Sequence, residues 1–67
     1  MTTTYRVEVS DGSDWNFGIR YDENKRIPVF CGVSSADRLD SYDEAEQLRQ
    51  DAIRICGGTT RVAAVRD

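Results

Sequence analysis

The sequence predicts a small α+β domain in which one helix packs on one face of a mainly antiparallel β-sheet, with the elements in the order β-β-β-α-β. Between residues 5 and 33, three segments alternate apolar and polar side chains, which is the pattern of half-buried strands. Residues 42–56 instead repeat apolar side chains at helical spacing. A chain of 67 residues suffices for one domain, so we expect residues 1–67 to form a single compact unit.

The first two predicted strands, residues 5–9 and 15–21, form a hairpin. Both place apolar side chains at odd positions, and the Asp-Gly-Ser-Asp segment at 11–14 has the composition of a turn. A register that pairs Val9 with Trp15 keeps the large apolar side chains on one face, whereas a shift of one residue scatters them. We therefore expect the aromatic residues of this face to lie in the core under the helix, namely Tyr5, Trp15, Phe17 and Tyr21.

The third predicted strand, residues 27–33, continues the meander with the same odd parity. The same argument pairs Asp22 with Arg26 and Gly18 with Phe30, all on the face away from the helix. An aromatic ring covering a strand glycine is a stabilising arrangement.

The helix is indicated by its start, its apolar stripe and its end. Ser41 and Glu44 match a capping box, in which each side chain satisfies a backbone N–H of the first turn. Gly57 and Gly58 supply the left-handed conformation that ends a helix. The apolar stripe between them consists of Ala45, Leu48, Ala52, Ile55 and Cys56.

The last strand, residues 59–66, has two open arrangements. If residues 34–40 form only a loop, this strand runs parallel to the first strand. If Arg38 and Leu39 form a short fifth strand near 38–40, the chain reverses and the last strand pairs antiparallel with the first. Pro28 cannot donate to a strand ladder, so the third strand is expected at a sheet edge.

The net charge of −3 is unevenly distributed along the chain. Two segments, from Glu8 to Glu23 and from Asp37 to Glu46, each carry five acidic residues against one arginine. Phosphate binding requires lysine and arginine, so this balance disfavours direct binding of nucleic acid. It favours a positively charged partner. No apolar run reaches the length of a membrane span, so neither a membrane nor a signal peptide is expected.

The residues do not predict an enzyme. The chain has no histidine, which removes the commonest general base and metal ligand. Cys31 lies on the apolar side of a strand and Cys56 at a helix C-terminus, where the dipole disfavours a thiolate, so both are expected to be buried hydrophobic residues. The turn at 11–14 lacks the spacing of a calcium loop. We expect no cofactor and no metal.

A second surface is the sheet face away from the helix. Its expected members include one exposed aromatic ring among arginines, a composition enriched at protein interfaces. This face defines the alternative function, a small regulatory or accessory domain that docks a protein partner. Its residues are Arg6, Glu8, Asn16, Arg20, Arg26, Pro28 and Phe30.

The chain resembles the small anti-CRISPR proteins of phages and mobile elements. The resemblance runs from the Thr-Tyr-Arg-Val-Glu-Val segment at 4–9, through Ser-Tyr-Asp-Glu-Ala-Glu at 41–46, to the last strand, and lies in size, acidity and element order. It is greatest to inhibitors of type I, and in particular type I-C, surveillance complexes. The resemblance implies a non-catalytic, monomeric inhibitor in the cytoplasm of a bacterial host. Its partner would be a Cas subunit, and its acidic surface would mimic DNA and block recognition of the target.

The carboxylates that would contact the basic surface of the Cas subunit come from the two acidic segments. Acids in a first helical turn also complement the helix dipole, which accounts for part of the second segment without any partner. The candidate partner-binding residues are Asp37, Asp40, Asp43, Glu44 and Glu46, followed by Asp11 and Asp14.

Overall fold

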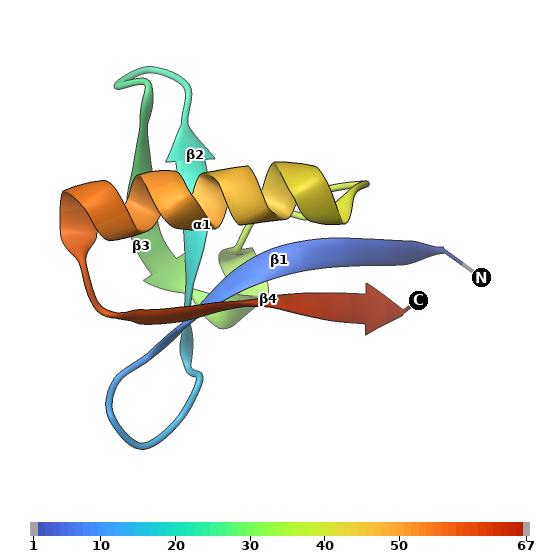
Figure 1. The fold of residues 1–67 in the computed structure, drawn as a ribbon, viewed down its shortest axis with the longest axis horizontal. Coiled ribbons are helices and arrows are strands. Elements are labelled where there is room, and N and C mark those ends of the chain that lie inside the picture. The colour runs from blue at the N-terminus through green and yellow to red at the C-terminus, as the bar shows by residue number, and fades with distance from the viewer. Residues whose placement is uncertain (1, 67) are drawn as a thin grey trace.

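A computed structural model describes residues 2–66, together with all of their side chains except that of Cys56. The helix lies across one face of a four-stranded antiparallel sheet (Figure 1). The predicted fold class and element order are therefore confirmed. In chain order the elements are β1 (Thr3–Ser10), β2 (Phe17–Asp22), β3 (Ile27–Gly32), the 3-10 helix η1 (Val33–Ser35), α1 (Tyr42–Cys56) and β4 (Thr59–Arg66). The strand order is β3-β2-β1-β4, so β3 lies at an edge as expected from Pro28.

The register of the first hairpin differs from the predicted one by two residues. Val9 pairs with Phe17 rather than with Trp15. The turn causes the shift, because the Asp11 carboxylate accepts hydrogen bonds from the backbone N–H groups of Ser13 and Asp14 and fixes a longer loop. A shift of two residues leaves every side chain on its predicted face, since side chains alternate with a period of two.

The second hairpin is shifted by one residue, which exchanges the two faces of β3. Asp22 pairs with Ile27, so the loop holds four residues instead of the predicted three. Arg26 N–H donates to the Asp22 carbonyl (2.6 Å), and Arg26 adopts a left-handed φ of 59°. Phe30 consequently lies opposite Ile19 on the helix side, and Cys31 lies opposite Gly18 on the other side. The predicted placement of both residues was wrong.

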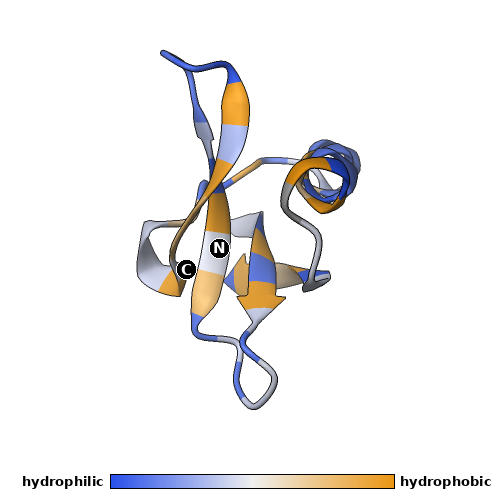
Figure 2. Ribbon diagram, turned by 90° about the vertical axis from the view of Figure 1, so that its left-hand side faces the viewer, coloured by the Kyte–Doolittle hydropathy of each residue, from blue (hydrophilic) through white to orange (hydrophobic). Residues whose placement is uncertain are grey.

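The core between α1 and the sheet is aliphatic rather than aromatic. Figure 2 shows the hydrophobic side of α1 turned toward the sheet. The predicted aromatic core was wrong because Phe17 and Tyr21 are 45% and 42% exposed and Trp15 leaves the strand ladder. Ile55, assigned to the buried stripe of the helix, is 55% exposed. The buried cluster consists of Val7, Val9, Ile19, Leu48 and Ala52, with Leu39 packed against it.

A short segment after η1 decides how β4 pairs. Leu39 forms a single antiparallel bridge with Tyr5, with both backbone hydrogen bonds at 2.8 Å. This contact reverses the chain before α1, and β4 then pairs antiparallel with β1 from Thr59 to Arg66. Of the two predicted arrangements, the one with a short extra pairing near 38–40 is confirmed.

The helix begins and ends where the sequence predicts. The Ser41 hydroxyl accepts a hydrogen bond from the backbone N–H of Glu44 (3.1 Å), and Gly57 caps the C-terminus at φ 71°. The positions of Ala45, Leu48 and Ala52 in the core are confirmed. The predicted burial of Cys56 concerns a side chain outside the described part of the structure.

Candidate functional site

The candidate acidic residues fall into separate places on the fold rather than one patch. Asp40, Asp43 and Glu44 lie around the N-terminus of α1, and we call them the helix-start group. Asp11 and Asp14 lie in the loop between β1 and β2, which we call the hairpin pair. Figure 1 shows the β1–β2 loop on the side of the molecule where α1 ends, away from its start. The 15 residues of α1 span about 22 Å at 1.5 Å per residue, so the two groups are well separated.

Asp37 is occupied by the fold itself. Its carboxylate accepts a hydrogen bond from the backbone N–H of Tyr21 (2.8 Å), and its own N–H donates to the Ile19 carbonyl (3.3 Å). The side chain therefore substitutes for a strand partner along β2, where β1 has diverged. We infer that Asp37 has a structural role and remove it from the candidate contact residues.

Glu46 is occupied by an ion pair within α1. Its carboxylate accepts from Arg49 Nε (2.8 Å), and Arg49 also reaches the Thr60 hydroxyl on β4 (3.5 Å). The hydrogen bond from Arg49 lowers the pKa of Glu46. An acid already paired in this way offers little charge to a partner.

The helix-start group keeps its carboxylates in solvent. Asp40, Asp43 and Glu44 are all exposed, and within residues 2–66 no ion pair involves them. The Ser41 cap fixes the first turn that carries Asp43 and Glu44. The partial positive charge at the N-terminal end of the helix dipole stabilises acidic residues in this turn. These three carboxylates are therefore held on an ordered helix start.

The hairpin pair is also exposed. Hydrogen bonds from the backbone N–H groups of Asp14 and Ser13 lower the pKa of Asp11, which keeps its carboxylate ionised. The same bonds tie the carboxylate to the turn, so Asp11 shapes this loop as well as charging it. Asp14 has no ion pair among the described residues.

Sequence reasoning missed a buried charge on the sheet face away from α1. Glu8 is only 4% exposed and is held between Arg6 and Arg61, with N–O distances of 2.7–2.8 Å. Burial by itself raises the pKa of Glu8, but the hydrogen bonds from Arg61 and Arg6 outweigh it and leave the pKa lowered. The Arg61 guanidinium also stacks 4.0 Å from the centre of the Trp15 ring. The alternation around Glu8 gave the face, but nothing local indicated that a residue of the last strand would cover it.

The alternative docking surface does not form as predicted. Phe30 and Pro28, assigned to the same face as the arginines, lie on the helix side of β3. Arg6 is engaged by Glu8. The predicted surface therefore lacks Phe30 and one of its cations.

A second missed feature is an apolar pocket at the C-terminal end of α1. It has a volume of about 360 Å³ and lies on the helix side of the sheet. The rings of Phe17 and Phe30, 45% and 52% exposed, form two of its walls. The predicted register hid this pocket because it placed the two rings on opposite faces. The lining residues are Val9, Ser10, Phe17, Phe30, Gly57 and Gly58.

Cys31 is a free, partly buried cysteine in β3. Burial raises the pKa of the free Cys31 thiol, which disfavours the nucleophilic thiolate. Among residues 2–66, no group of three acidic, cysteine or histidine side chains is placed to hold a metal ion.

Comparisons with protein-family models, with curated proteins and with solved structures gave no match. In the part of the chain that the structure describes, no helix is long and apolar enough to cross a membrane.

Proposed function

We propose that this chain is a non-catalytic inhibitor of the anti-CRISPR type, which binds a Cas subunit of a type I surveillance complex and blocks recognition of target DNA. The observation that carries the proposal is the helix-start group, in which Asp40, Asp43 and Glu44 stand exposed and without an ion pair in residues 2–66. A surface that binds DNA offers arginines and lysines to phosphates. Carboxylates on an ordered helix start complement such a surface.

The contact that we propose involves fewer residues than the two acidic segments contain. Asp37 and Glu46 are engaged within the fold, so the helix-start group is the primary contact and the hairpin pair a secondary one. The mimicry of DNA is local, because the exposed Arg20, Lys25 and Arg26 side chains elsewhere on the surface carry the opposite charge.

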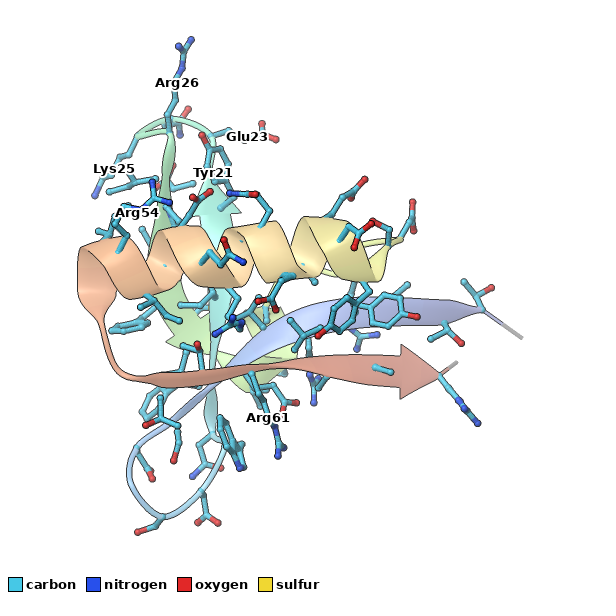
Figure 3. All side chains as sticks on the ribbon, viewed as in Figure 1. Tyr21, Glu23, Lys25, Arg26, Arg54 and Arg61 are labelled. Carbon is cyan, nitrogen blue, oxygen red and sulfur yellow. The ribbon has the colours of Figure 1, made fainter. Side chains whose placement is uncertain are left out.

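The test is recovery of the partner from cells that carry a type I CRISPR system. A tagged chain should capture a Cas subunit in a one-to-one complex, and the complex should fail to bind its target DNA. The variant Asp40→Lys should lower the recovery. The matched control is Glu23→Lys, which makes the same charge change at an exposed residue on the β2–β3 turn (Figure 3) and should leave recovery unchanged.

Two results would contradict the proposal. One is that the parent chain captures no Cas subunit. The other is that Asp40→Lys and Glu23→Lys weaken recovery equally, because net charge alone would then explain the binding.

A further inference from the structure

We infer that the apolar pocket at the C-terminal end of α1 binds an apolar side chain of a protein partner that is flanked by a lysine or an arginine. The pocket lies at the end of α1 opposite the helix-start group, and its lining residue Ser10 directly precedes the loop that carries the hairpin pair, so we treat it as a second contact region. The inference rests on the proposed function in one respect: it expects the partner to be basic. The experiment below does not require that partner.

The pocket stays open because of the residues around it. Gly32 lies opposite Phe17 and brings no side chain, and a Cβ built on it meets nothing within 4 Å. Gly57 and Gly58 border the other side, with φ values of 71° and 97° that other residues adopt only with strain. Two aromatic walls are therefore left facing solvent beside a buried floor at Val9.

Exposed acidic residues follow the pocket along the chain. Asp11 directly follows the lining residue Ser10, and Asp14 lies in the same loop. The last carbonyl groups of α1 end at Gly57, where the helix dipole adds a partial negative charge. Arg54, the base of the last helical turn, reaches Asp51 (3.8 Å) and projects toward the β2–β3 turn in Figure 3.

These charges select among the occupants of the pocket. A second copy of the chain, docked through the same face, would bring its own Asp11 and Asp14 against those of the first copy and be repelled. A small molecule needs several polar groups to orient it. The Ser10 hydroxyl already accepts a hydrogen bond from Gly12 N–H (3.0 Å). An apolar side chain can pack against the Phe17 and Phe30 rings, and a neighbouring cation is attracted by the carboxylates of the hairpin pair.

The probe is a capped tripeptide, Arg-Phe-Arg, titrated into the isotope-labelled protein while amide NMR signals are followed. We expect saturable shifts of the Val9, Gly57 and Gly58 amides. Capped Glu-Phe-Glu and Arg-Ser-Arg peptides, which lack the charge or the anchor, should produce no saturable shift. This readout separates the two proposals, because it holds whether or not a Cas subunit is the partner.

The Phe30→Ala variant tests the pocket wall directly. It should weaken the affinity for Arg-Phe-Arg about tenfold, as expected for loss of a contact at an anchor. The matched control is Ile55→Ala, which truncates a side chain of similar exposure (55%) outside the pocket and should leave the affinity unchanged. Amide spectra of both variants report whether each is folded.

Three outcomes would overturn the inference. The first is the absence of a saturable shift with Arg-Phe-Arg. The second is equal binding of Glu-Phe-Glu, which would remove the role of the hairpin pair. The third is a set of pocket shifts that depends on protein concentration without peptide, which would make a second copy the occupant.

Discussion

Gly18 shows how tightly a single position of the sheet is packed. A Cβ added to it would lie 2.6 Å from the Ala36 Cβ and 3.2 Å from the Val7 carbonyl oxygen. The segment after η1 therefore rests directly on the backbone of β2, and this close approach needs a residue without a side chain.

Substitution of this glycine is predicted to destabilise the fold. Gly18→Ala should lower the free energy of unfolding by about 1–3 kcal/mol, because the neighbouring backbone must shift to admit a methyl group. Gly32→Ala is the control, since its Cβ would meet nothing within 4 Å and its φ is −64°. Urea titrations of both variants check this, and equal losses of stability would contradict the packing argument.

Glu8 makes stability depend on pH. Its pKa is lowered in the folded protein, so its carboxylate adds stability that is fully present above its ordinary pKa of 4.5 and is lost as the pH falls through the lower folded value. Glu8→Gln removes this contribution and should cost about 2 kcal/mol at neutral pH, because it breaks charge-assisted hydrogen bonds to Arg6 and Arg61.

The measurement is the free energy of unfolding from about pH 6 to about pH 3. Asp11 and Glu46, whose pKa values are also lowered, contribute equally in both proteins. The Glu8→Gln curve should therefore fall less steeply than that of the parent. Parallel curves would show that Glu8 is no more stabilised as an anion when folded than when unfolded.

At the scale of elements, the β2–β3 hairpin carries strain at one residue. Arg26 holds a φ of 59°, a left-handed conformation that costs a residue with a Cβ about 1 kcal/mol. Arg26→Gly should therefore raise the free energy of unfolding by about that amount. Arg26→Ala removes the same charge but keeps the Cβ, and thermal unfolding should show no gain for it. A gain in the alanine variant would point to charge rather than backbone strain.

The same hairpin explains how much of the fold could be predicted. The existence and order of the first three strands follow from alternation, and the start and end of α1 follow from Ser41 and Gly57. The faces of the β3 residues could not be predicted in this way. One extra residue in the turn moves Phe30 to the helix side of the sheet and Cys31 to the other side. Alternation shows which residues of one strand share a face. The length of the turn decides which of these two sets faces the helix.

The candidate site was predicted unevenly for a related reason. The acidic character and exposure of Asp40, Asp43 and Glu44 could be inferred from the sequence. The engagement of Asp37 by the Tyr21 backbone N–H depends on a long-range contact and could not. The pocket between Phe17 and Phe30 also required the true register.

At the scale of the molecule, the proposed contact predicts a dependence on salt. The Debye length falls from about 10 Å at 0.1 M to about 3 Å at 1 M, so attraction between exposed charges weakens. The rate of association with the Cas subunit should fall accordingly, because such charges act mainly on encounter. The double variant Asp40→Lys, Asp43→Lys should associate more slowly and with a flatter salt dependence.

Circular dichroism is the control for this variant, since loss of Asp43 near the helix start costs about 0.3–1 kcal/mol. The expected result is a folded protein with altered kinetics. A folded double variant that associates as fast as the parent at every salt concentration would show the helix-start group to be solvated surface only.

We expect the sheet to open in two parts, because Asp37 bonds to β2 and Leu39 bonds to β1 where these two strands are no longer paired with each other. β1 pairs with β4 at eight positions but with β2 at only two, and Figure 1 shows β2 and β3 running steeply across the direction of β1 and β4. Opening of the outer hairpin thus breaks few bonds to the remainder of the sheet. In hydrogen exchange, the amides of β3 should exchange through this partial opening, and those of β1 only through global unfolding. Equal protection in both strands would mean that the sheet opens as a whole.

Unequal protection would have a consequence for the pocket. Its wall at Phe30 would belong to the hairpin that opens first, and its floor at Val9 to the part that stays folded. A side chain bound in the pocket would therefore contact both parts and hold them together.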